Sequence, residues 1–325
     1  MTDRHPKLST PWGLTQTTAP GAGGDSFEAW TGRTVATPWP AAYGGDLSVG
    51  ALAAAVRSAA AGQLPHSMQI AFLLPGDRDR TLSYVVERVR DGFRYANRSV
   101  RLVQSNREIA AATVLLRAPC PGEAPAANVP GVEGIPGPES LPTAAEAIAA
   151  RGPLSAAAGD PAPLDAYWAE ARALDTRHID PPLYGETVQP RTTNRVWVRF
   201  TGNEPAQREL LATPEGRIAL VAYIADDTIL EPAAAALGHG WLAPGMFSTT
   251  VQQNIWFHSD FSPSDWLLFS QRLVSATGDH VVCQGEIVAR RCSRRHSHTG
   301  GDRASAPSFQ RVTLSLVAPA EPRPS

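Results

Sequence analysis

The sequence contains little that would fix the fold by covalent cross-links or metal. Its 325 residues include only three cysteines, Cys120, Cys283 and Cys292. Their number is odd, and their spacing fits neither a disulfide framework nor a zinc ribbon. We therefore expect reduced thiols and no metal site.

Long apolar runs and an excess of one charge are also lacking. No run approaches the roughly 20 apolar residues that span a bilayer, and the opening MTDRHPKLSTPWG lacks the apolar core of a signal peptide. Lys and Arg total 29 against 31 Asp and Glu, giving a formal net charge of −2. This balance offers no bulk electrostatic reason to bind nucleic acid or an anionic membrane. We expect a cytoplasmic protein whose partners are small or local.

Proline, glycine and alanine replace the periodic apolar pattern in two places. Residues 1–26 form an expected flexible N-terminal segment, and residues 120–163 an expected linker, since CPGEAPAANVPGVEGIPGPESLP is too rich in proline for a helix or central strand. A short helix fits TAAEAIAARG within this linker. The predicted domains are then residues 27–119 and 164–319, followed by a tail, 320–325.

Either side of the linker the same order of elements occurs twice. The first half reads as a strand, WTGRTVAT, an Ala-rich helix, SVGALAAAVRSAAAG, and the strands SMQIAFLL, TLSYVVERV, RYANRSVRLVQ and EIAAATVLLRA. The second half reads as a strand, NRVWVRF, a helical region, TPEGRIALVAYIADDTILEPAAAALG, and the strands TTVQQNIWFH, DWLLFSQRLVSA, HVVCQGEIVARR and SFQRVTLSLVA. Thr213 offers cap chemistry at the start of the second helix. This repeat predicts an α+β fold, the double hot-dog, in which each half wraps a long helix in an antiparallel sheet and the copies bury each other's edges.

Short motifs in both halves also carry a family resemblance. The segments YGGDLSVGALAAA, HSMQIAFLLPGD, ERVRDG, VWVRFTG, WFH and DWLLFS, and the strand with Gln310, occur in the order expected of acyl-CoA thioesterase II. The chain resembles these double hot-dog enzymes over most of its length outside the linker and termini. The resemblance implies hydrolysis of an acyl-CoA or acyl-carrier-protein thioester, with no cofactor beyond the coenzyme A of the substrate. It also implies a homo-oligomer.

The residues that activate water in this family are changed in this sequence. By the resemblance, the carboxylate lies six residues before the His of WFH, where this chain has Gln252, and the hydroxyl lies at Val274. The third member, an amide, is retained as Gln310. Ser275 follows the lost hydroxyl by one position, which on a strand is the opposite face, so it replaces the hydroxyl only if a bulge intervenes.

A carboxylate occurs instead at the start of the first helix. Asp46 follows Gly44 and Gly45, where relatives usually have an amide residue. Thioester hydrolysis needs a base or nucleophile and donors for the developing oxyanion, and helix-start N–H groups favour an anion. We hypothesise that Asp46 is a relocated catalytic carboxylate facing Gln252 and Gln310, while the glycine N–H groups hold the thioester oxygen. The alternative is that Asp46 only caps the helix.

For several other residues, a structural interpretation stands beside a functional one. Asp226 is a second acid candidate, or a solvent-facing residue of a helical turn. The segment 290–298, RRCSRRHSH, fits an exposed loop that could contact phosphates of coenzyme A or an acidic carrier protein, in preference to a metal site. His66 and His258 fit packed strand residues. Core positions are expected for three tryptophans, Trp197, Trp256 and Trp266.

Two other functions stay open at this point. The chain could bind an acyl thioester without hydrolysing it, or catalyse another reaction on an acyl chain, such as dehydration. A hydratase-type hot-dog enzyme would carry an Asp followed closely by a His on its helix, and GGDLSVGALAAAV contains no His.

Overall fold

The structure, a computed structural model, describes most of the chain. The described residues are 12–17, 27–35, 37–39, 41–119, 134–156, 160–201, 205–246, 248–258, 260–278, 280–290 and 308–317, the last of these by backbone only.

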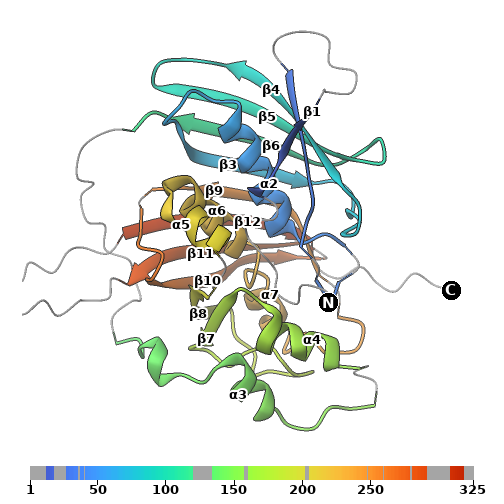
Figure 1. Cartoon of the computed structure of the whole chain (residues 1–325). Helices are drawn as coiled ribbons and strands as arrows, with labels where there is room; N and C mark the ends of the chain where they lie inside the picture. Colours follow the sequence, from blue (N-terminus) through green and yellow to red (C-terminus); the bar gives the residue numbers. More distant parts are fainter. Residues whose placement is uncertain are drawn as a thin grey trace, which may run out of the picture.

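One twelve-stranded antiparallel sheet connects both halves of the described chain (Figure 1). Its first-half strands are β1 (Thr15–Thr17), β2 (Phe27–Gly32), β3 (Leu64–Phe72), β4 (Leu82–Arg90), β5 (Tyr95–Gln104) and β6 (Arg107–Arg117). Its second-half strands are β7 (Leu174–His178), β8 (Thr193–Phe200), β9 (Thr249–Trp256), β10 (Trp266–Thr277), β11 (His280–Arg290) and β12 (Ser308–Val317).

The strand order is nearly symmetric about its centre. The order is β1-β2-β4-β5-β6-β3-β9-β12-β11-β10-β8-β7, so each half repeats the other in reverse. Strands β3 and β9 join the halves, with Ser67 opposite Trp256 and Ala71 opposite Gln252. The start of β9 therefore lies beside the end of β3, and the end of β9 beside the start of β3.

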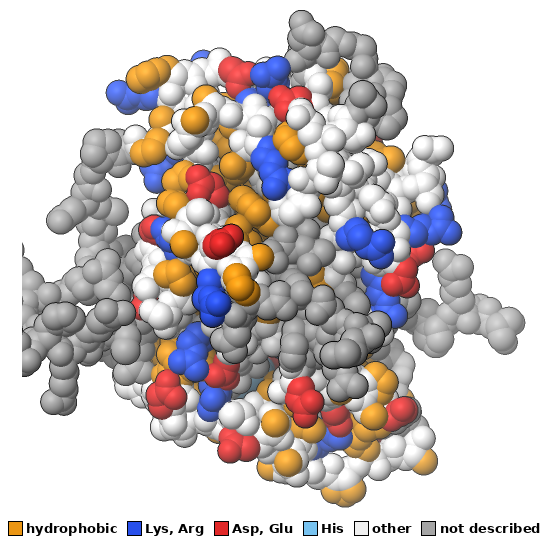
Figure 2. Space-filling view, in the orientation of Figure 1, with side chains coloured by type: hydrophobic (Ala, Val, Ile, Leu, Met, Phe, Trp, Pro, Cys, Tyr) orange, Lys and Arg blue, Asp and Glu red, His pale blue; other side chains and the backbone are white. Residues whose placement is uncertain are grey.

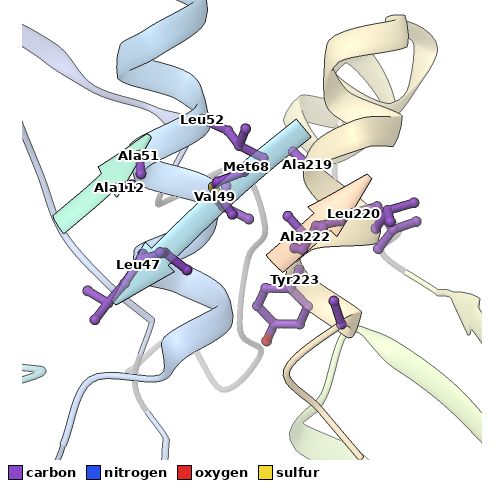
Figure 3. Close-up of a cluster of buried hydrophobic side chains, with 14 of the residues drawn as sticks. Leu47, Val49, Ala51, Leu52, Met68, Ala112, Ala219, Leu220, Ala222 and Tyr223 are labelled. Atoms are coloured by element: carbon purple, nitrogen blue, oxygen red, sulfur yellow. The ribbon is translucent and has the colours of Figure 1, made fainter. Parts of the chain in front are cut away.

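Two helices, α2 (Gly44–Arg57) and α6 (Pro214–Ile224), pack against each other and against the sheet (Figure 1). Small side chains lie on both helices: Ala219 and Ala222 on α6, and Ala51 on α2, where Figure 3 shows it beside Ala112 of β6. They belong to one apolar cluster with Met68 of β3, which Figure 3 shows between the helices. The side chain of Thr213 caps α6 by accepting from Gly216 N at 3.1 Å. This confirms the predicted start of the second helix.

A further layer of short elements covers the β7–β8 end of the sheet. It contains a 3-10 turn (Pro138–Ser140), α3 (Ala144–Ala149), α4 (Ala162–Ala166) and a π-helical turn (Tyr167–Ala171). Thr143 and Glu146 form a capping box at α3, which confirms the short helix expected in TAAEAIAARG. Trp197 Nε1 donates to Pro136 O at 3.0 Å, so this segment is fastened to β8.

Several expectations need correction. The second helical region is not continuous, because α6 ends at Ile224, and α7 (Glu231–Ala236) follows a turn that contains Asp226. Strand β7 and helix α5 (Pro205–Ala212) were not predicted. Trp256 was expected in the core and is instead 39% exposed, since its neighbours Ile255 and Phe257 take the inward positions.

The surface carries charged side chains of both signs, in agreement with the nearly balanced composition. Lys and Arg side chains are interspersed with Asp and Glu over the face in Figure 2. Within the ranges given above, no helix combines the length and apolarity that crossing a membrane requires. The same residues contain no group of three or more His, Cys, Asp or Glu side chains placed to hold a metal. Cys283 is buried and unpaired, whereas Cys120 and Cys292 lie outside the described residues.

Candidate functional site

The start of α2 meets the end of α6 and the first residues of β9. This junction follows from the fold, since the two helices pack side by side while β9 runs antiparallel to β3. It brings together the glycines before Asp46, the turn after α6 and Thr250. We call this group of residues the α2-start site.

Asp226 lies at the centre of the α2-start site. Thr250 Oγ1 donates to Asp226 Oδ1 at 2.8 Å, and the backbone N–H of Gly45 also donates to this carboxylate. A Cβ atom on Gly44 would lie 2.5 Å from Asp226 Oδ2, so only glycine leaves room for the carboxylate there. Asp226 is half-buried. The solvent-facing interpretation of this residue is therefore wrong.

Asp46 lies on the third residue of α2 and points into the protein. Its side chain makes no cap hydrogen bond with the helix; instead, Val35 N donates to Asp46 Oδ2 at 2.8 Å. The capping interpretation of Asp46 is therefore wrong. The residue is 0% exposed, and Oδ1 has no hydrogen-bond partner within the described part of the chain. A carboxylate so placed cannot meet a substrate unless neighbouring groups move.

Burial raises the pKa of both carboxyl groups to near physiological pH. Desolvation raises the pKa of Asp46 to about 7 against a hydrogen bond from Val35, and the charge of Asp226 adds to the rise. Desolvation likewise raises the pKa of Asp226 to about 7, opposed by the hydrogen bond from Thr250. General bases work best with a pKa near the operating pH, so both groups are suited to accept a proton.

Aromatic rings and one ion pair enclose this side of the site. Tyr43 Oη donates to Tyr223 O at 2.8 Å, and the two rings meet edge to face at 5.1 Å. Arg172 pairs with Asp227, the neighbour of Asp226, and both side chains are nearly buried. Desolvation raises the pKa of Tyr43 and Tyr223, so both phenols stay neutral. The pairing of Asp227 with Arg172 leaves Asp226 as the partly exposed carboxylate of this turn.

Gln252 faces the wrong side of the sheet for the role expected of it. Its neighbour Gln253 is buried and accepts from Ser48 Oγ of α2 at 3.2 Å. Successive strand residues point to opposite faces, so Gln252 points away from α2. The amide facing the helix is thus Gln253, whose Nε2 has no partner among the described atoms. In the sequence, only the presence of two adjacent glutamines indicated that Gln253 could be the residue facing the helix.

Gln310 is also removed from the expected cluster. The register of β12 places Arg311 opposite Trp256 and Ser315 opposite Gln252. Gln310 is therefore five residues along the strand from the partner of Gln252, roughly 16 Å at about 3.3 Å per residue. The two amides do not surround one carbonyl. The side chain of Gln310 lies outside the described part of the structure.

The bulge on which Ser275 depended is present. The pairing of β10 with β11 shifts register between Leu273 and Ser275, leaving Val274 unpaired. Both Val274 and Ser275 are exposed, on a stretch of β10 beyond its pairing with β8. Ser275 is therefore exposed to solvent despite the bulge.

The remaining candidates lie elsewhere. His66 on β3 is half-buried, and desolvation together with the charge of Arg117 lowers its pKa. His258 follows β9 and borders a surface pocket with Arg117. Residues 291–298, which include most of the arginine-rich segment, lie outside the described residues.

Two family models match the chain in succession. The first, "Acyl-CoA thioesterase N-terminal domain", matches residues 35–117, and the second, "Acyl-CoA thioesterase C-terminal domain", matches residues 139–291. Acyl-CoA thioesterase 2 of Haemophilus influenzae is 25% identical over 250 residues, covering 76% of this chain and 82% of that protein. Acyl-coenzyme A thioesterase 8 of Homo sapiens is 24% identical over 266 residues, covering 80% and 79%.

Solved structures resemble this one over nearly the whole chain. An acyl-CoA thioesterase II from Mycobacterium marinum has a TM-score of 0.66 at 20% identity, covering 96% of this chain and 98% of that one. A protein from Alicyclobacillus acidocaldarius, described as having a hot dog fold, has a TM-score of 0.63 at 18% identity, covering 97% and 98%. At these identities the likeness shows a shared fold.

Proposed function

Because this chain belongs to the acyl-CoA thioesterase family, we propose that it hydrolyses acyl-CoA thioesters at the α2-start site, with Asp226 as general base. The observation that carries this assignment is the Asp226 carboxylate, which Thr250 Oγ1 holds at 2.8 Å beside the glycines that begin α2. The architecture proposed with it is the double hot-dog, supported by the strand order that repeats in reverse about β3 and β9.

The reaction proceeds by attack of water on the thioester carbonyl carbon. Asp226 removes a proton from the water as its oxygen bonds to the carbon, and the carbonyl oxygen gains negative charge. The carbon–sulfur bond then breaks, the proton passes to the thiolate, and a carboxylic acid and a thiol leave. General-base assistance of this kind is worth about 10² to 10⁴ in rate.

The N-terminal end of α2 stabilises the developing oxyanion. The N–H groups of a first helical turn point out of the helix, and the dipole favours negative charge there. Gly45 N–H already donates to Asp226, so Gly44 N–H is the donor left for the thioester oxygen. Gly44 lacks a Cβ, which keeps this backbone within reach of a substrate.

Asp46 interacts with Asp226 through charge, without a direct hydrogen bond between the two carboxyl groups. The charge of Asp226 contributes to the raised pKa of Asp46, so ionisation of one disfavours ionisation of the other. A nearby negative charge favours the protonated form of a carboxyl group. A protonated Asp46 therefore leaves Asp226 ionised and ready to accept a proton.

The reaction needs water, an acyl thioester and the side chains of this chain, with coenzyme A entering as part of the substrate. An acyl-carrier-protein thioester has the same reactive carbonyl and is the alternative substrate. We also propose that the protein is cytoplasmic and that it forms a homo-oligomer; the exposed apolar residues Val251 and Trp256 on β9 support the second of these proposals.

A panel of acyl-CoA esters of increasing chain length tests the activity. The purified chain is assayed for thiol release and, in parallel, for binding of each ester. Hydrolysis requires thiol release above the spontaneous rate for at least one ester, with an equal yield of free acid. Tight binding of an ester without thiol release would instead support a non-hydrolytic acyl-thioester-binding protein, and the proposal of an enzyme would be withdrawn.

A further inference from the structure

A pocket of about 200 Å³ lies at the opposite end of the paired helices from the α2-start site. It opens between the first turn of α6, the start of β3, the end of β6 and the residues after β9. Its walls are mainly apolar and include Leu64, Ile218, Phe257 and Phe261. We call it the α6-start pocket.

The internal repeat makes this pocket the counterpart of the α2-start site. At the α2-start site, the beginning of α2 faces Thr250 at the start of β9. Phe72, at the end of β3, is also close: its Cζ atom would lie 3.2 Å from a Cβ atom added to Gly44. In the α6-start pocket, the beginning of α6 faces the start of β3 and the end of β9. The antiparallel pairing of β3 with β9 relates the two places. The fold therefore builds two equivalent positions, with different side chains in each.

The chemistry of the pocket differs from that of the α2-start site. Arg217 Nε and Asp260 Oδ1 are 2.5 Å apart, and Arg217 also bonds the carbonyl oxygens of Leu211 and Ala212 at 3.0 Å. This ion pair neutralises both charges. Asp260 is the only acidic side chain among the described residues that line the pocket, so Arg117 leaves it with net positive charge. Among the described lining residues, the one carboxylate is thus held in an ion pair with Arg217.

We propose that the α6-start pocket binds a short aliphatic carboxylate, with the chain against the apolar wall and the carboxylate toward Arg117. Apolar walls with one convergent charged group are the usual composition of a small-ligand site. A volume of about 200 Å³ lies below the roughly 300 Å³ at which sites for drug-sized ligands begin, so the ligand is small. The proposal concerns binding and does not depend on the chain being a hydrolase.

Direct binding of octanoate, measured by calorimetry without any thioester present, tests this site. Octanoate should bind the wild-type protein, and Arg117→Gln should weaken that binding about tenfold, the usual size of a lost charge-assisted hydrogen bond. Binding of the neutral analogue 1-octanol should not change with Arg117→Gln. Arg101→Gln, which removes an exposed arginine of β5 outside the pocket, serves as the matched control and should leave both ligands unaffected.

A second variant separates the pocket from non-specific adsorption. Ile218→Trp places a large side chain in the pocket and should abolish binding of both octanoate and 1-octanol, provided that its melting temperature shows an intact fold. Coenzyme A alone, titrated in the same way, should bind no more weakly to Arg117→Gln than to wild type, because the site takes the carboxylate and not the phosphates. Octanoate binding that is absent in wild type, or unchanged in Arg117→Gln, contradicts the proposal.

Discussion

At the scale of residues, the buried carboxylate of Asp46 is placed where it weakens the fold. Asp46 is fully buried, and one of its oxygens has no hydrogen-bond partner among the described residues; burying an unpaired charge is strongly unfavourable. Leu at this position would avoid that cost. Retention of groups that cost stability is typical of functional sites, which is consistent with a role for this residue in proton transfer.

The stability of the protein should therefore depend on the ionisation of Asp46. Its pKa is raised from 3.8 to about 7 on folding, so the folded state binds the proton more tightly than the unfolded state. Between pH 4 and pH 7 the free energy of unfolding should fall, by up to about 4 kcal/mol at 1.36 kcal/mol per unit of pKa shift. Urea unfolding at several pH values should show a smaller fall in Asp46→Asn. If the free energy of unfolding depended on pH equally in wild type and in Asp46→Asn, the burial assigned to Asp46 would be contradicted.

Thr250 should position the base and tune its pKa. Its hydrogen bond lowers the pKa of Asp226 against desolvation, so Thr250→Val should raise that pKa. A hydrogen bond to a charged group is worth about 1.5 to 3 kcal/mol, which corresponds to a shift of about one unit or more in the acid limb of the pH–rate profile. Thr250→Ser keeps the hydroxyl and should restore the wild-type profile. An unshifted profile in Thr250→Val would remove Thr250 from the site.

At the scale of elements, the alternation of apolar and polar residues predicted the strands well. Eight hairpin strands, β3 to β6 and β9 to β12, occur within a few residues of the expected segments. Period-two patterns are reliable where one face of a strand is buried. Strand β7 was missed because LDTRH has no such pattern and lies next to proline-rich sequence.

The catalytic positions could not be predicted by counting along the motifs. A shift of one residue moves a side chain to the other face of a strand, and this separates Gln252 from Gln253. The register of β12 similarly depends on its pairing with β9, which the sequence does not reveal. The contact of Asp226 with Thr250 joins a helix turn to a strand 24 residues later in the chain, and no local pattern marks it.

Restoring the family carboxylate should consequently fail to raise activity. Gln252→Asp places a carboxylate on the face of β9 that points away from α2, where no catalytic partner was found among the described residues. Thiol release should stay within about twofold of wild type, alone or combined with Val274→Thr, because general-base gains of about 10² require contact with the attacking water. A tenfold increase in kcat/KM would show that the site lies on that face.

At the scale of the whole molecule, the repeat in the sequence predicted the architecture. Two copies of one order of elements, with equal numbers of strands after each helix, leave few ways to bury both helices other than a shared sheet. The segment 134–190 was harder to predict, because its short helices are held by contacts such as that of Trp197 with Pro136, which are distant in sequence.

The exposed apolar residues of the sheet predict self-association. Val251 and Trp256 on β9 and Val274 on β10 are 38%, 39% and 48% exposed, and we expect a second chain to cover part of this apolar surface. Light scattering at assay concentrations should give a mass of at least two chains, and Trp256→Arg should reduce it. A monomer at all concentrations would contradict a homo-oligomer.

The central claim is that Asp226 is the base of a thioester hydrolase, and its most direct test is the kcat/KM for the preferred acyl-CoA in Asp226→Asn. The exchange keeps the size of the side chain, and the loss should be about 10² to 10⁴. Asp79→Asn, at a carboxylate that is 81% exposed, is the matched control and should retain full activity. Wild-type activity should rise with pH to a plateau above about 7, as the pKa of Asp226 requires. Full activity in Asp226→Asn, with an unchanged pH profile, would contradict the account.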